Sequence, residues 1–99
     1  MPKRIFSYEQ AVALLPEVVR LTSEAVERVE QTVSEEPAAY ERIVTEWAES
    51  IMGMGVEVKG LWLVDFDSGG GYYCWKHPEP ALEYFHGYEE GFGGRVKLN

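Results

Sequence analysis

The sequence predicts an α+β protein, in which a long antiparallel helical hairpin over about residues 7–54 is followed by a small antiparallel β-sheet of two to three strands. Apolar residues in the first half recur at alternating spacings of three and four, which is typical of helices with one buried face. Two short segments of the second half are rich in aromatic and β-favouring residues and flank a run of glycines. The sheet and a C-terminal loop should occupy about residues 56–99, and the 99 residues together form a single domain, 1–99.

The first helix is expected to begin at Ser7. Ser7 and Gln10 match a capping box, in which each side chain binds the other residue's backbone amide, and Phe6 can pack on Ala11. Pro16 predicts a bend rather than an end, because the apolar stripe continues past it. The residues of this stripe are Leu15, Val19, Thr22, Val26, Val29 and Val33.

A second helix is expected to begin near Pro37, since proline is tolerated in a first turn, where its missing amide would be unpaired anyway. It should end near Gly53. Two apolar seams joined by a few residues predict antiparallel packing, with Trp47 and Ile51 on Val19, Val26 or their neighbours. The stripe of the second helix consists of Tyr40, Val44, Trp47, Ile51 and Met54.

The second half is expected to form a β-hairpin with strands at residues 61–66 and 72–76, joined by the glycine-rich turn at 67–71. The His-Pro-Glu-Pro run that follows cannot lie in a central strand, because each proline removes a hydrogen-bond donor. A third strand is expected within residues 81–86.

The length of the hairpin turn decides which polar side chains share a face. A five-residue turn puts Cys74 and Asp65 on opposite faces, whereas a four-residue turn or a bulge brings Asp65 round to the face of Cys74. We expect the five-residue turn. Asp65 could then pair with His86 or Arg95 in a buried polar cluster that orders the C-terminal loop. The residues of this candidate cluster are Asp65, His86, Glu89 and Arg95.

A metal site is the alternative hypothesis for the same region. It would use Cys74 and His86, with Asp65 and either Glu89 or Glu90 as oxygen ligands, and this donor set suits zinc or a similar divalent cation. The sequence lacks the paired ligands typical of structural zinc sites. We therefore expect no cofactor, with Cys74 as a small buried hydrophobic residue and His86 hydrogen-bonded to Asp65 or to a backbone carbonyl.

Catalysis is disfavoured by the same residues. Cys74 and His86 are the one Cys/His choice for a nucleophile with a base. A cysteine between aromatic residues in an acidic chain lacks the electropositive, partly exposed surroundings of an activated thiol. The glycine-rich segment 91–95 could offer amides to an anion with Arg95 as the counter-charge, but a tight turn is the favoured interpretation. We expect no catalytic residues.

Composition excludes several partner classes. The net charge is −8 and the 9 Lys and Arg residues are scattered, which argues against nucleic-acid binding. No apolar run approaches the roughly 18 residues of a membrane span, and the start lacks the apolar region of a signal peptide. A single cysteine fits a reducing compartment. We expect a cytoplasmic protein without membrane contact.

Self-association is expected because a chain of this size has a modest core. In the five-residue register an apolar outer sheet face would remain, and a two-fold contact through it predicts a homodimer. The favoured function is a non-enzymatic oligomeric or adaptor module with an unknown protein partner. The alternative is a divalent-metal-binding protein. The apolar outer face would contain Leu61, Leu63, Tyr73 and Trp75.

Four stretches in this order resemble a family of short prokaryotic proteins, domain of unknown function 2203, over most of the chain. They are "ALLPEV" (13–18), "GVEVKGLWLVDF" (55–66), "CW" (74–75) and "YFHGYEEGFGGR" (84–95).

The resemblance implies a set of family positions but no established activity. His77 and the triple glycine of the hairpin turn look peculiar to this sequence. The family positions implied are Asp65, Cys74-Trp75, Phe85-His86, an acid near Glu89, and the Gly-Phe-x-Gly-Arg run from Gly91 to Arg95.

Overall fold

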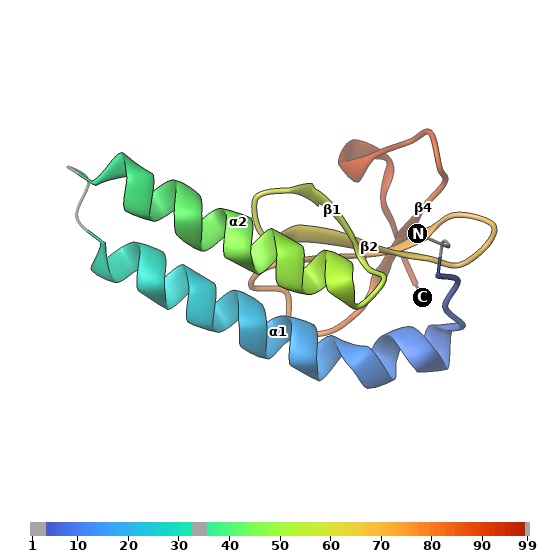
Figure 1. Cartoon of the computed structure of the whole chain (residues 1–99). Coiled ribbons are helices and arrows are strands. Elements are labelled where there is room, and N and C mark those ends of the chain that lie inside the picture. Colours follow the sequence, from blue (N-terminus) through green and yellow to red (C-terminus); the bar gives the residue numbers. More distant parts are fainter. Residues whose placement is uncertain (1–3, 33–35, 99) are drawn as a thin grey trace.

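The computed structural model describes residues 4–32 and 36–98, and it confirms an α+β fold with two helices followed by a sheet (Figure 1). The sheet has five strands among these residues, so the prediction of two to three was wrong. The elements are α1 (Tyr8–Gln31), α2 (Pro37–Gly53), β1 (Glu57–Gly60), β2 (Leu63–Asp67), β3 (Tyr72–Lys76), β4 (Tyr84–His86), the short 3-10 helix η1 (Phe92–Gly94) and β5 (Val96–Lys97).

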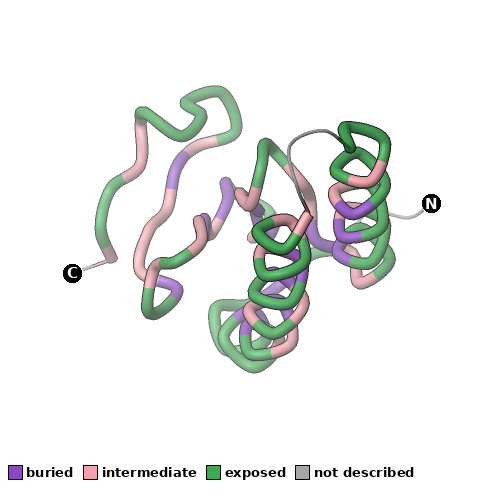
Figure 2. The backbone as a smooth tube through the Cα atoms, turned by 90° about the vertical axis from the view of Figure 1, so that its left-hand side faces the viewer, coloured by how far each residue is buried: buried purple, intermediate pink, exposed green. Residues whose placement is uncertain are grey.

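The sheet is an antiparallel meander in the order β1-β2-β3-β4-β5. The two helices lie side by side along one face of it, and the C-terminal segment lies on the side away from them (Figures 1 and 2). The two strands that the sequence did not predict are its edges. β1 has the sequence EVKG and β5 has two residues, so neither has the run of β-favouring residues that identifies a strand.

The start of α1 confirms the capping box. Ser7 Oγ accepts from the Gln10 amide at 3.1 Å, and Gln10 Oε1 accepts from the Ser7 amide at 2.9 Å. Phe6 is buried and packs edge-on against Phe66 of β2, with 5.3 Å between ring centroids. Its amide also donates to the carbonyl oxygen of Asp67 at 2.7 Å. The entry to the first helix is therefore bonded to the end of β2.

The helical hairpin is confirmed, but the seam of α1 is shifted from the predicted one. The helix continues through Pro16, as expected. Val19 and Val26 are only partly buried, because the neighbouring positions Val18 and Ala25 face the core. Val19 with Val26 and Val18 with Ala25 both fit the helical period of 3.6. The buried residues of α1 are Ala11, Leu15, Val18, Thr22 and Ala25, while the predicted Val33 lies outside the described residues.

The second helix starts at Pro37, as predicted, and its buried residues are Ile43, Trp47 and Ile51. Tyr40, which the predicted stripe included, is 40% exposed. Trp47 meets α1 at Thr22, whose hydroxyl accepts from the indole Nε1 at 2.8 Å. Neither described helix is long and apolar enough to cross a lipid bilayer.

The register of the β2–β3 hairpin corrects the sequence analysis. Asp65 pairs with Cys74 and Asp67 pairs with Tyr72, so the turn has four residues, 68–71, and the expected five-residue turn was wrong. Asp67 belongs to the strand because its carbonyl is held by Phe6 and its Oδ1 accepts from the Gly69 amide at 2.9 Å. Asp65 and Cys74 therefore share a face.

The same register reverses the expected faces of β3. Trp75 is 1% exposed and packs in the core with the helices, and Tyr73 packs against that core. The expectation that Tyr73 and Trp75 lie on an apolar outer face was wrong, because one residue of register moves every side chain to the other face. The homodimer itself stays a prediction, and its expected surface loses Tyr73 and Trp75 but keeps the exposed Leu61.

Candidate functional site

The outer face of the sheet brings together three side chains of different chemistry. Asp65 comes from β2, its register partner Cys74 from β3, and His86 from β4. One ligand atom of each lies within 4.8 Å of the other two, and all three residues are buried. The exposed fractions are 1% for Asp65, 1% for Cys74 and 4% for His86. This cluster contains a carboxylate, a thiol and an imidazole out of contact with bulk water.

Both nitrogens of His86 face oxygen acceptors. Nδ1 lies 2.8 Å from the carbonyl oxygen of Gly87, and Nε2 lies 3.0 Å from Asp65 Oδ2. A neutral imidazole carries one N–H and so satisfies only one of these contacts, while an ionised carboxylate donates nothing. The position of the ring proton therefore decides which of the two contacts is a hydrogen bond.

Asp65 carries a second sign of incomplete bonding. Its Oδ1 is buried and has no hydrogen-bond partner within residues 4–32 and 36–98. A buried carboxylate oxygen without a donor is costly, because it has lost its hydrogen bonds to water. The carboxylate that the sequence suggested as a partner for His86 does bind it, and the Cys74 thiol faces the same carboxylate.

The thiol of Cys74 is held in its neutral form. Burial raises its pKa to about 12, and the neighbouring Asp65 carboxylate acts in the same direction, while Arg95 opposes the shift. Arg95 Nη1 donates toward Cys74 Sγ at 3.8 Å. Cys74 is therefore not activated as a nucleophile, because the reactive species is the thiolate and the raised pKa favours the thiol.

The raised pKa of Cys74 predicts a slow reaction of its thiol with thiol reagents. At pH 8 the single thiol of the metal-free native protein should react with Ellman's reagent roughly 10³-fold more slowly than in the urea-unfolded chain, because a pKa near 12 leaves far less thiolate than an ordinary value near 8.5. The release of thionitrobenzoate measures both rates directly. Equal rates in the native and unfolded protein would show that Cys74 is accessible and ionised.

Arg95 fixes the C-terminal segment over the outer face. Its guanidinium donates to both carboxylate oxygens of Glu79, at 3.0 and 2.7 Å. It also stacks between the rings of Tyr84 and Phe92, at 4.0 and 4.1 Å from their centroids. Glu79, rather than Asp65, is thus the ion-pair partner of Arg95. Glu79 was not predicted from the sequence, because it lies between two prolines in a segment assigned only to a turn.

The two glutamates proposed as further ligands do not join the cluster. Glu90 Oε1 accepts from the amide of Gly87 at 2.7 Å and so stabilises the turn after β4. Glu89 is exposed in the same turn. Another acid, Asp67, accepts from the Tyr88 hydroxyl at 2.7 Å on the outer face. Its spacing of two from Asp65 was the signal that could have placed both on one face.

A cavity of about 260 Å³ adjoins the cluster. Lys59 lines it, with Nζ 3.1 Å from Glu57 Oε1 and 4.3 Å from the centroid of the Tyr72 ring. The cavity is lined by Lys59, Leu63, Asp65, Cys74, His86, Tyr88, Gly91 and Phe92.

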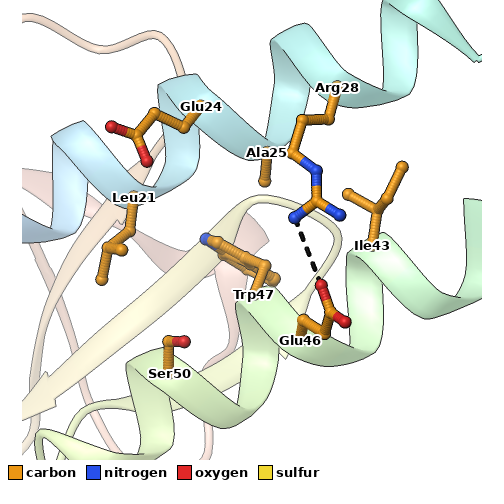
Figure 3. A pocket seen from close by; sticks show the side chains of 8 residues that line it. All are labelled: Leu21, Glu24, Ala25, Arg28, Ile43, Glu46, Trp47 and Ser50. Carbon is orange, nitrogen blue, oxygen red and sulfur yellow. Dashed lines mark hydrogen bonds and ion pairs between the residues drawn. The ribbon is translucent and has the colours of Figure 1, made fainter.

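A second cavity, of about 170 Å³, lies between the two helices (Figure 3). Its charged groups bind each other, since Arg28 Nη1 lies 3.2 Å from Glu46 Oε1. Both side chains are about half exposed, where an ion pair contributes little. The lining contains neither cysteine nor histidine, and the chemistry therefore concentrates at the sheet. The lining residues are Leu21, Glu24, Ala25, Arg28, Ile43, Glu46, Trp47 and Ser50.

The fold and the site define a small α+β protein with a buried Asp-Cys-His cluster on the outer face of its sheet. A family model described as "Uncharacterized conserved protein (DUF2203)" matches residues 27–98, so the chain belongs to this family. The match confirms the resemblance seen in the sequence, and it assigns no activity. No curated protein and no solved structure is significantly similar to the chain.

Proposed function

We propose that the protein binds a divalent transition-metal ion, best matched by zinc, through Asp65, Cys74 and His86. The observation that carries the proposal is the approach of three buried donor atoms to within 4.8 Å of one another. Zinc accepts thiolate, imidazole and carboxylate ligands together. Magnesium and calcium prefer sites made of oxygen atoms, so the thiol of Cys74 disfavours them.

The orientation of His86 supports this proposal. Histidines that bind metals usually donate their other N–H to a carbonyl or carboxylate, which fixes the ring and leaves one lone pair for the ion. Nδ1 of His86 has such a contact with the Gly87 carbonyl, 2.8 Å away. Nε2 then presents its lone pair toward Asp65 Oδ2, 3.0 Å away. A metal ion at this point would be bound by both atoms and by the nearby thiolate of Cys74.

The spacing of the donor atoms is close to what zinc needs. With Zn–N and Zn–O bonds near 2.0 Å and Zn–S near 2.3 Å, ligand atoms around a tetrahedral ion lie about 3.3–3.6 Å apart. The largest separation in the cluster is below 4.8 Å, and Nε2 of His86 is already 3.0 Å from Asp65 Oδ2. Side-chain movements of about 1 Å are enough to reach these distances.

Binding would also change the protonation of Cys74, because a thiol coordinates as the thiolate and releases its proton. Arg95, which donates toward Sγ at 3.8 Å, is placed to stabilise the sulfur charge. We propose metal binding ahead of the adaptor hypothesis. The adaptor hypothesis used an apolar outer face of the sheet, and Tyr73 and Trp75, two of its four residues, face the core instead.

Elemental analysis tests the proposal. Protein reconstituted with zinc and freed of excess metal should retain one ion per chain, and Cys74→Ala, His86→Ala and Asp65→Asn should each retain much less. The matched controls are Glu89→Gln and Glu90→Gln, which change nearby acids outside the cluster and should keep the wild-type content. Circular dichroism of each variant checks that it is folded.

Two results would overturn the proposal. One is a folded wild-type protein that holds no zinc after reconstitution. The other is zinc content that stays the same in folded Cys74→Ala and Asp65→Asn, since the metal would then bind elsewhere.

A further inference from the structure

We propose that a metal ion held by Asp65, Cys74 and His86 keeps one coordination position open toward the adjoining cavity, and that this position takes a small anion recognised by Lys59. This inference rests on the proposed metal site and extends it from holding an ion to binding an exchangeable ligand.

The number of ligands is the first argument. The described part of the chain supplies three donor atoms to the cluster, one fewer than four-coordinate zinc requires. The neighbouring carboxylates are bound elsewhere. Glu57 Oε1 accepts from the Tyr72 hydroxyl at 3.1 Å and also contacts Lys59, and Glu90 Oε1 accepts from the Gly87 amide. Three protein ligands with an open fourth position are typical of zinc sites that bind water or substrate, whereas structural sites are closed.

The cavity is the second argument, because all three donors line it. Its volume of about 260 Å³ leaves room for a ligand of a few heavy atoms, since one water molecule takes up about 30 Å³ in the liquid. Tyr88 and Phe92 also line the cavity and are each 45% exposed, so they form its rim toward solvent. A small solute can therefore reach the ion without unfolding the sheet.

Lys59 indicates the charge of that solute. It is the one cation among the described residues lining the cavity. Glu57 and the face of the Tyr72 ring hold its ammonium group at the wall. A divalent ion with the Cys74 thiolate and the Asp65 carboxylate is formally neutral, so an added anionic ligand leaves a negative charge. The positive charge of Lys59 partly offsets it, and a buried charge needs such a partner.

Cobalt-substituted protein titrated with azide tests this inference. Cobalt(II) bound by a thiolate gives sulfur-to-metal charge-transfer absorption, and its ligand-field bands report the coordination sphere. We expect saturable changes of the ligand-field bands as azide replaces water. Lys59→Met, which keeps the length of the side chain over Tyr72, should weaken azide binding about tenfold and leave cobalt affinity unchanged, because one nearby charge is worth about 1.4 kcal/mol. Lys76→Met, outside the cavity lining, is the matched control and should behave as wild type.

The outcomes separate this inference from the metal site itself. Cobalt bound with its charge-transfer band, but with ligand-field bands indifferent to azide, would mean a closed site and would overturn the open position alone. Azide affinity equal in wild type and Lys59→Met would overturn the role of Lys59. Absence of the charge-transfer band would reject both the inference and the proposed function.

Discussion

Replacing Trp47 by alanine is expected to lower the free energy of unfolding by about 3–5 kcal/mol, the range found when large buried aromatic residues are truncated. Trp47 is 4% exposed. Its Nε1 donates to Thr22 Oγ1 at 2.8 Å, and its ring meets that of Trp62 edge-on at 4.9 Å. The side chain thus joins α2 to α1 and to the β1–β2 connection. Urea denaturation followed by circular dichroism measures the loss.

Two further variants locate the effect. Tyr40→Ala, on the same helix but 40% exposed, should change stability by no more than about 0.5 kcal/mol. Trp47→Phe keeps most of the buried area and removes the indole donor, so we expect a cost of about 1–3 kcal/mol from the buried Thr22 hydroxyl. A Trp47→Ala protein that unfolds at the wild-type midpoint would contradict the assigned packing.

The helices were predictable from the sequence because their signals are local. The capping box of Ser7 and Gln10 and the start at Pro37 depend on neighbouring residues alone. The seam was less certain, since Val18 and Val19 both continue a helical stripe and only the approach of α2 selects between them. The edge strands escaped prediction because β1 and β5 are defined by their partners more than by their own residues.

The candidate site shows how one residue of register changes a functional prediction. Asp65, Cys74 and His86 were all named from the sequence, but the expected turn separated the first two. What decides the turn length is non-local: the Phe6 amide bonds the Asp67 carbonyl and keeps that residue in β2. No pattern within the hairpin contains this information. Glu79, the partner of Arg95, was missed for a similar reason. The chain turns between Lys76 and Glu79, and only this turn brings Glu79 to Arg95.

Zinc is expected to stabilise the protein by about 4 kcal/mol when its free concentration is a thousand times its dissociation constant, provided that the unfolded chain does not bind it. Asp65 Oδ1 is buried without a hydrogen-bond partner among the described residues, and His86 contacts the buried Asp65 Oδ2 and the partly buried carbonyl of Gly87. An ion in this position would bind the Asp65 carboxylate and the His86 imidazole, and its charge would offset that of the thiolate that Cys74 forms on coordination. Folding and metal binding should therefore be coupled.

Urea unfolding at buffered free zinc measures this coupling, with magnesium at the same concentration as the control for general ionic effects. The increment should disappear in Cys74→Ala, whose smaller side chain leaves the fold least disturbed, and should persist in Glu90→Gln, because a glutamine oxygen can still accept from the Gly87 amide. An equal increment in the wild type and Cys74→Ala would assign the stabilisation to a surface site. An increment that magnesium reproduces would reject thiolate coordination, since magnesium prefers oxygen ligands. The stabilising ion would then be bound by carboxylates without the thiol of Cys74.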